Sequence, residues 1–240
     1  MTENAVVYVH TGKCLPIFNE LMDSVYQTLL INGVDTKIYI ITNDNFIPTL
    51  KEKIKKFDLR YFKKEKGCSS ILNLINFIPI SILENSKKLG VYRNFRNLFC
   101  DNVKNFRDSF WISTTLRFFY IEEFMNLFCI DNIFHIENDV MLYENLLDFS
   151  KVLNKDYMYV VKDNGNRVIP SLLYIKKDTL GDFNDFIISE IKNGYLNDME
   201  LLGKFNHPFL KYFNFELTNT DVNYVVDGAA IGQYLGGVDP

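Results

Sequence analysis

The sequence has few of the features that assign a protein to a class at once. Its four cysteines contain no CxxC pair, so neither a zinc site nor a disulfide framework is indicated, and a reducing, cytoplasmic location is the default expectation. The longest apolar stretch, residues 71–83, contains two Asn and one Pro and is shorter than the roughly 20 residues that span a bilayer. We therefore expect no transmembrane segment.

A surplus of basic residues is also absent. The formal net charge is −4, and an acidic residue, Glu3, lies near the start, where a secretory signal would be basic. We therefore expect neither a nucleic-acid partner nor export. With 48% hydrophobic and 23% charged residues, the composition is that of a globular protein. We expect one domain over residues 1–240, and the turn-like residues 232–240 suggest that it is cut from a longer chain.

A glycine-rich phosphate loop is the third absence. Residues 10–18, which follow the first strand-like run, contain a single Gly. Enzymes that make sugar nucleotides normally hold a triphosphate at this place with a loop rich in Gly, Arg and Lys, so that class is disfavoured. No GxGxxG follows any predicted strand either, which disfavours a dinucleotide-dependent oxidoreductase.

The sequence does contain an alternation of strand-like and helix-like segments. Continuous apolar runs rich in β-branched and aromatic residues predict buried strands, and apolar residues at three- and four-residue spacing predict helices. The alternation predicts an α/β fold with a mainly parallel sheet, whereas residues 63–108 show no clear pattern. We predict strands at residues 5–9, 37–42, 59–62, 132–136, 157–161 and 171–175, and helices at residues 17–31, 47–57, 113–129 (with Ser-Thr-Thr as its N-terminal cap), 144–153 and 178–192.

Two carboxylates follow the predicted strand at residues 132–136. Glu137 and Asp139 are separated by one residue, and side chains two apart on a strand point to the same side. Because ligands of open α/β sheets bind outside the carboxyl ends of the strands, these acids are well placed to hold a hard cation such as Mg²⁺ or Mn²⁺. The alternative is a solvated turn without function.

Together these segments resemble a glycosyltransferase of the GT-A fold. The tripeptide at residues 137–139, Glu-Asn-Asp, is similar to the DxD motif of that class, with Glu in place of the first Asp. Arg117 on the preceding helix, the strand at residues 171–177, the acidic segment 197–200 and the late segment 227–237 resemble the same class in the expected order. The resemblance implies a Rossmann-like, mixed and mainly parallel sheet flanked by helices.

The resemblance also implies how a nucleotide-sugar donor, most often a UDP-sugar, would be bound. Asp139 would ligate Mn²⁺ or Mg²⁺ on the donor diphosphate, and Glu137 would reach the ribose, the metal or a metal-bound water. The Arg117 guanidinium would offset phosphate charge or contact the sugar. Four residues at the ends of the first two strands would form the pocket for the nucleotide base: His10, Thr11, Asn43 and Asp44.

On the acceptor side, the resemblance implies a general base only if the anomeric centre is inverted. Glu200 and Asp198 are then the candidates, whereas a retaining enzyme needs no such base. Asp227 would hold the donor sugar or the acceptor. The class commonly adds a late metal-binding His, for which His207 is the available residue.

Each site residue also has a structural alternative. Arg117 could reach solvent from the rim of an apolar helix, and His10 could be a hydrogen-bonded residue at a strand end. Asp198 and Glu200 could be charges favoured by a helix N-terminus, and Asp227 could belong to a tight turn.

The sequence thus predicts a metal-dependent glycosyltransferase that acts on a glycan or protein acceptor. A noncatalytic module of the same fold, which binds a nucleotide sugar or a glycan, is the alternative from a different class. A sugar nucleotidyltransferase is the second alternative, because it shares the sheet and an acidic metal site.

Overall fold

The fold is built on a mixed seven-stranded sheet. The structure is a computed structural model, and it describes residues 5–11, 18–33, 36–61, 71–100, 106–162, 167–193 and 196–213. The strand order is β3-β2-β1-β4-β6-β5-β7. β6 is antiparallel to both of its neighbours and every other pair is parallel, which confirms the predicted fold class. The strands are β1 (Ala5–His10), β2 (Lys37–Thr42), β3 (Ile75–Pro79), β4 (Asn132–Ile136), β5 (Met158–Lys162), β6 (Val168–Lys176) and β7 (Leu210–Tyr212).

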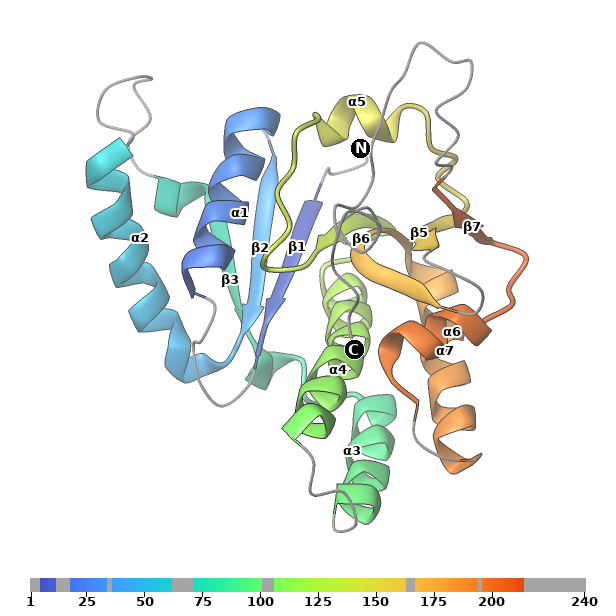
Figure 1. The fold of residues 1–240 in the computed structure, drawn as a ribbon. Helices are drawn as coiled ribbons and strands as arrows, with labels where there is room; N and C mark the ends of the chain where they lie inside the picture. The colour runs from blue at the N-terminus through green and yellow to red at the C-terminus, as the bar shows by residue number, and fades with distance from the viewer. Residues whose placement is uncertain are drawn as a thin grey trace.

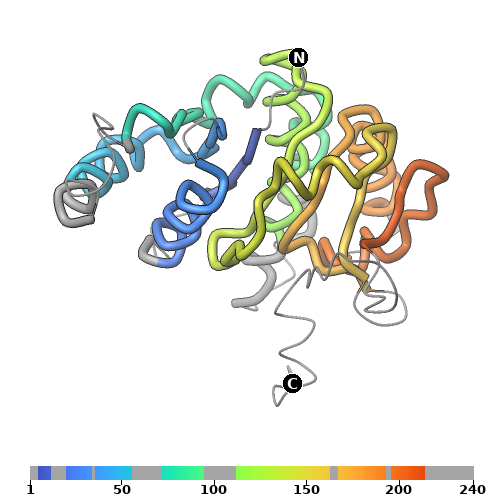
Figure 2. Tube along the Cα trace, turned by 90° about the horizontal axis from the view of Figure 1, so that it is seen from above, coloured from blue at the N-terminus to red at the C-terminus, as the bar shows by residue number. Residues whose placement is uncertain are grey.

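Helices cover both faces of this sheet (Figure 1), and the view from above in Figure 2 shows the resulting layers. Among the described residues, no helix is long and apolar enough to cross a membrane. The α-helices are α1 (Phe18–Asn32), α2 (Ile47–Tyr61), α3 (Lys87–Cys100), α4 (Phe106–Leu127), α5 (Leu146–Ser150), α6 (Lys177–Glu190) and α7 (Asp198–Lys204), and the short 3₁₀ helices are η1 (Asp44–Phe46), η2 (Ile71–Leu74), η3 (Ile80–Ile82) and η4 (Ile191–Asn193).

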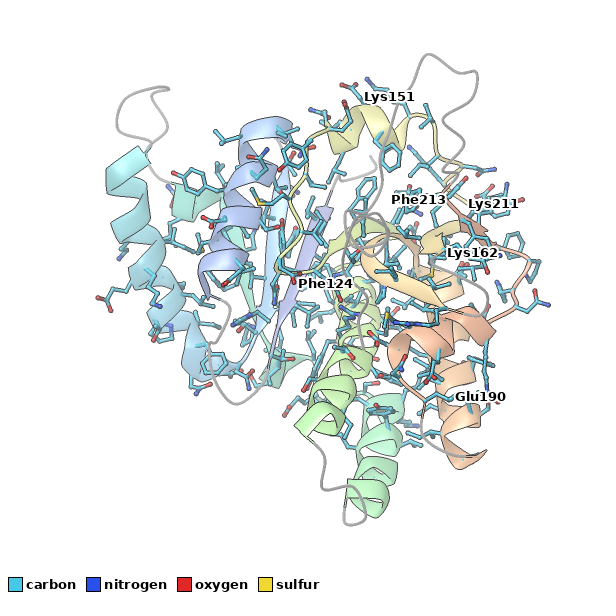
Figure 3. The ribbon with its side chains drawn as sticks, in the orientation of Figure 1. Phe124, Lys151, Lys162, Glu190, Lys211 and Phe213 are labelled. Atoms are coloured by element: carbon cyan, nitrogen blue, oxygen red, sulfur yellow. The ribbon has the colours of Figure 1, made fainter. Side chains whose placement is uncertain are left out.

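Alternate residues of the strands face two separate hydrophobic cores. Val6 and Tyr8 of β1 pack in one core with residues of α1, α2 and α5. Val7 packs in the other core with residues of α3, α4, α6 and α7. Phe124 of α4, labelled in Figure 3, is fully buried in this second core, with its ring centroid 4.8 Å from that of Tyr39 on β2. The central strands are therefore covered on both sides, as their continuous apolar runs predicted.

One predicted strand is wrong. Residues 59–61 form the last turn of α2, and residue 62 lies outside the described ranges. The sequence explains the difference, because Leu50, Ile54, Phe57 and Tyr61 continue one helical stripe at three- and four-residue spacing. The third strand is instead β3, in the segment for which the pattern allowed no prediction.

The predicted start of the long helix is also wrong. α4 begins at Phe106, seven residues before the Ser-Thr-Thr that was expected to cap it. These hydroxyl residues lie inside the helix, and Thr115 is buried within it. Hydroxyl side chains are tolerated in a helix interior when they find partners there, so a Ser-Thr-Thr run does not by itself mark a start.

A polar network connects the three helices α3, α4 and α6. The Nζ of Lys88 on α3 donates to Glu122 Oε1 on α4 at 3.0 Å, and it also donates to the carbonyl oxygen of Gly181 on α6 at 3.0 Å. The second carboxylate oxygen of Glu122 accepts from Asn184 Nδ2 at 2.7 Å. The buried Glu122 carboxylate is thus held from two sides, which fixes how α6 packs on α4.

Two glycine substitutions test the rigidity of this network. Replacing Gly90 by Ala is expected to stabilise the fold by about 0.5–1 kcal/mol, since Ala is the better helix former and the added Cβ meets nothing within 4 Å. Replacing Gly181 should lower stability, because its Cβ would lie 3.2 Å from Glu122 Oε1, which Lys88 and Asn184 keep in place. Urea unfolding of both variants measures the difference, and an equal gain in the two would show that the Glu122 carboxylate moves freely.

Candidate active site

The carboxyl ends of β1, β2 and β4 meet at one edge of the sheet, where most of the predicted site residues lie. These strands are parallel neighbours, with β1 between the other two. The acidic tripeptide at residues 137–139 follows β4 directly, while residues 10–11 and 43–44 lie at the ends of β1 and β2. Ligands of open α/β sheets bind outside this edge, so the topology places the predicted residues where a ligand is expected.

Arg117 of α4 forms ion pairs with two acidic side chains from different elements. Its Nη1 donates to Glu137 Oε1, and its Nη2 lies 2.5 Å from Asp198 Oδ2 at the start of α7. Only 7% of the Arg117 side chain is exposed, so the alternative in which it reaches solvent is wrong. Burial alone would lower the pKa of Arg117, but the charges of Glu137 and Asp198 raise it.

The two acids of the tripeptide have different surroundings. The backbone N–H of Glu137 donates to the carbonyl oxygen of Ser171 on β6 at 2.9 Å, and its carboxylate accepts from Arg117. Asp139 is exposed, yet partial burial and the nearby charge of Glu137 raise the pKa of its carboxyl. A divalent cation beside both carboxylates would relieve this repulsion.

These residues fit a metal ion that is shared with a phosphate ligand. Within the described ranges, no three or more His, Cys, Asp or Glu side chains are grouped so that they could enclose an ion. One oxygen of Glu137 already accepts from Arg117, which leaves Asp139 as the better placed ligand. Mg²⁺ is commonly bound by one or two carboxylates together with substrate phosphates and water. The donor set therefore fits Mg²⁺ or Mn²⁺ in the company of a diphosphate.

The middle residue of the tripeptide, Asn138, points back toward β1. Its Nδ2 lies 3.3 Å from the carbonyl oxygen of Val9 and 3.1 Å from Nδ1 of His10. His10 is 4% exposed and its ring lies near that of Phe46, with centroids 6.3 Å apart. Burial lowers the pKa of His10, so the ring is neutral at pH 7. Among the described residues, His10 Nε2 and Asn138 Oδ1 are buried without a hydrogen-bond partner.

The remaining residues of the predicted base pocket lie at the same edge. Thr11 is half-buried directly after β1, and Asn43 lies between β2 and η1. The carboxylate of Asp44 accepts from the backbone N–H and the hydroxyl of Ser81, at 3.2 Å and 2.5 Å. Asp44 therefore connects the turn after β2 to the turn after β3, a structural role that is compatible with its place at the pocket.

The two candidate general bases lie in the first turn of α7. Glu200 and Asn197 form a reciprocal capping box: Glu200 Oε2 accepts from the Asn197 N–H at 3.1 Å, and Asn197 Oδ1 accepts from the Glu200 N–H at 2.9 Å. Asp198 is 1% exposed and forms the ion pair with Arg117. Burial raises the pKa of Asp198, while the charge of Arg117 opposes the rise.

Two other residues were predicted to belong to the site, and only one of them, His207, lies in the described part of the chain. Asp227 lies outside the described residues. His207 Nδ1 accepts from the backbone N–H of Phe209 at 3.3 Å, and its Nε2 lies 3.2 Å from Asp182 Oδ2 on α6. The described contacts of His207 are thus with α6 and its own loop, and not with residues 137–139.

Sequence reasoning did not single out two hydroxyl residues that lie beside the Arg117 ion pairs. Ser171 Oγ is buried with no partner among the described residues, and Thr114 hydrogen-bonds to Asp198. Both had a signal. Ser171 interrupts an apolar strand with a small polar side chain, and Thr114 lies three residues before Arg117, which puts both on the same face of the helix.

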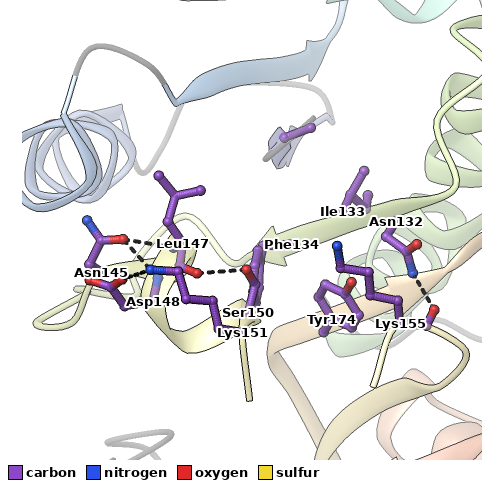
Figure 4. Close-up of a pocket in the computed structure, with 11 residues that line it drawn as sticks. Asn132, Ile133, Phe134, Asn145, Leu147, Asp148, Ser150, Lys151, Lys155 and Tyr174 are labelled. Carbon is purple, nitrogen blue, oxygen red and sulfur yellow. Dashed lines mark hydrogen bonds and ion pairs between the residues drawn. The ribbon is translucent and has the colours of Figure 1, made fainter. Parts of the chain in front are cut away.

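A cavity of about 390 Å³ lies at the opposite edge of the sheet (Figure 4). Its walls include Ala5 and Asn132, the first residues of β1 and β4, together with Lys151 at the end of α5. The acidic tripeptide is at the carboxyl end of β4, so this cavity is separate from the candidate active site.

No protein-family profile matches the sequence, and no characterised protein matches it in sequence. The structure is similar to mouse xyloside xylosyltransferase 1, with a TM-score of 0.55, 10% identity, and coverage of 88% of this chain and 84% of that chain. It is also similar to the bifunctional glycosyltransferase WbbM, with a TM-score of 0.55, 10% identity, and coverage of 89% and 39%. GlyE of Streptococcus pneumoniae TIGR4 gives a TM-score of 0.48 at 14% identity, with coverage of 90% and 46%.

This chain therefore spans less than half the length of WbbM and GlyE but most of the mouse enzyme. At these identities the two comparisons with a TM-score of 0.55 establish a shared fold and no more. The chain has a GT-A-like glycosyltransferase fold.

Proposed function

We propose that this protein is a glycosyltransferase that moves a sugar from a nucleotide donor, specifically a UDP-sugar, to a glycan or protein acceptor, with Mn²⁺ or Mg²⁺ on the donor diphosphate. One observation carries the proposal. Glu137 and Asp139 follow the central strand β4 at the edge of the sheet where ligands bind, and a buried Arg117 holds the first of them. The glycosyltransferase fold supports this assignment.

In this proposal Glu137 and Asp139 contact different parts of the bound donor. Asp139 ligates the metal, and Glu137, held by Arg117, faces the ribose, the metal or a metal-bound water. When bound, the metal acts as a Lewis acid that stabilises negative charge on the departing nucleoside diphosphate. Asp227 is proposed to hold the donor sugar or the acceptor.

Arg117 acts mainly through the residues it holds. Both of its terminal nitrogens are bound to carboxylates, Nη1 to Glu137 and Nη2 to Asp198. It therefore orients Glu137 directly and connects α4 to α7 across the site. Its positive charge lies close to the place proposed for the diphosphate and offsets part of the negative charge there.

Of the two candidate general bases, Glu200 gives the clearer test. Asp198 is already paired with Arg117, whereas Glu200 is held only by the capping box among the described contacts. We expect Glu200→Gln to lower turnover by about 10²–10⁴-fold if the enzyme inverts. Stability should stay within about 0.5 kcal/mol of the parent, because Gln also serves at this position of a capping box. Steady-state kinetics beside urea unfolding measures both. Unchanged turnover in a stably folded variant would remove Glu200 as the base and leave either Asp198 as the base or a retaining reaction.

Nucleotide binding tests the proposed function directly. The melting temperature of the chain should rise with UDP and Mn²⁺ together, by an amount that corresponds to about 2.7 kcal/mol at a hundredfold excess over Kd. Either component alone should give a smaller rise, because metal and diphosphate bind as a unit. No rise with UDP and Mn²⁺ would contradict the proposal, and binding without turnover of any donor would favour the noncatalytic module.

A further inference from the structure

The contact between His10 and Asn138 determines which ring nitrogen of His10 carries the proton. The Val9 carbonyl oxygen can only accept a hydrogen bond, so the Asn138 atom 3.3 Å from it is the amide nitrogen and not the amide oxygen. The same nitrogen lies 3.1 Å from His10 Nδ1. The amide has two hydrogens, one for each neighbour, and Nδ1 therefore accepts.

A neutral imidazole that accepts at Nδ1 carries its proton on Nε2. His10 is 96% buried, as its relative exposure is 4%, and the structure gives Nε2 no hydrogen-bond partner within the described ranges. The backbone of His10 is fixed at the end of β1, since Thr42 Oγ1 donates to the His10 carbonyl oxygen at 2.6 Å. A buried donor that lacks an acceptor is costly, so this N–H is suited to an acceptor supplied by a ligand.

We propose that Asn138 is a positioning residue that fixes His10 as the Nε2–H tautomer, so that His10 donates a hydrogen bond to a carbonyl oxygen of the nucleoside base. The inference rests on the proposed function and deepens it by naming a base-specificity device. A base with a carbonyl at this point, such as uracil, is then preferred over one with an amino group there, such as cytosine. The middle residue of the acidic tripeptide thereby couples the metal end of the site to the base end.

The Asn138→Asp variant reverses the contact. A carboxylate can only accept, so His10 must donate from Nδ1, and Nε2 becomes an acceptor that suits an amino group. UDP and CDP share the ribose and the diphosphate, so the added negative charge weakens both equally, and the ratio of their dissociation constants isolates the base contact. Asn138→Ala is the second variant, which releases the ring without adding charge.

The test combines NMR of the histidine ring nitrogens in the free chain with calorimetric titration of UDP and CDP in the presence of Mn²⁺. We expect the His10 proton on Nε2 in the parent and on Nδ1 in Asn138→Asp. We expect UDP to bind roughly tenfold more tightly than CDP to the parent, the size of one hydrogen bond. That preference should be lost in Asn138→Ala and lost or reversed in Asn138→Asp.

Protonation of the parent His10 on Nδ1 would overturn the inference, and so would a UDP to CDP ratio that is unchanged in both variants. Failure of the parent to bind either nucleotide would overturn the proposed function and with it the base contact. The NMR readout needs no ligand, so the position of the proton is judged separately from the proposed function.

Discussion

Exchange of Asp139 for Asn is expected to abolish metal-dependent release of the nucleotide while the chain stays folded. This carboxylate is the exposed acid of the tripeptide and the proposed metal ligand. Loss of a Lewis acid that supplies several kcal/mol to the transition state corresponds to a fall in turnover of about a thousandfold or more. Nucleotide release from the donor, followed with and without Mn²⁺, measures this effect.

Stability should move in the opposite direction to activity. The pKa of the Asp139 carboxyl is raised in the folded chain, so between the unfolded and folded pKa values the folded state binds more protons and stability falls as the pH rises. At pH 7 the ionised Asp139 therefore opposes folding, and Asp139→Asn should unfold at an equal or higher urea concentration. Asp148→Asn, at an exposed acid on α5, is the matched control, which should leave turnover unchanged and lower stability by no more than about 1 kcal/mol. Full turnover in Asp139→Asn would contradict the metal site.

Replacement of Arg117 by Met should be severely destabilising, by about 3–5 kcal/mol, because it leaves buried charge without a partner. The two side chains concerned, Glu137 and Asp198, are 29% and 2% exposed. Lys151→Met is the control, because it breaks an ion pair whose side chains are 74% and 58% exposed, and such a pair is worth about 0–1 kcal/mol. Lys151 lies at the outer surface, directly after α5 (Figure 3).

Urea unfolding of the two Met variants gives the comparison. Adding Asp198→Asn to the Arg117→Met variant should recover part of the loss, since it removes the more deeply buried of the two charges. Equal destabilisation by Arg117→Met and Lys151→Met would show that the ion pairs of Arg117 do not hold α4, β4 and α7 together.

The strands that are buried on both faces could be predicted from the sequence. The predicted strands 37–42 and 132–136 match β2 and β4 residue for residue, because a continuous apolar run between turn signals leaves little choice. β3 could not be predicted, because it contains Asn76 and ends in Pro79, residues that are uncommon in strands. Within the described ranges β3 pairs only with β2, and an edge strand tolerates such residues.

For the candidate site, the sequence indicated which residues lie at the edge of the sheet but not how they pair. Glu137 and Asp139 could be located because they follow a recognisable strand. The ion pairs of Arg117 could not, because they join residues 20 and 81 positions apart in the chain and depend on how α4 and α7 pack. The contact between His10 and Asn138 spans 128 positions and needs the β1–β4 pairing to be known.

The most direct test of the central claim is nucleotide release from a panel of UDP-, GDP- and CMP-sugars, with and without Mn²⁺, for the parent chain and for Asp139→Ala. The account predicts release from a UDP-sugar that requires the metal and disappears in the variant. Release that persists in Asp139→Ala, or no release from any donor together with no effect of UDP and Mn²⁺ on the melting temperature, would contradict it.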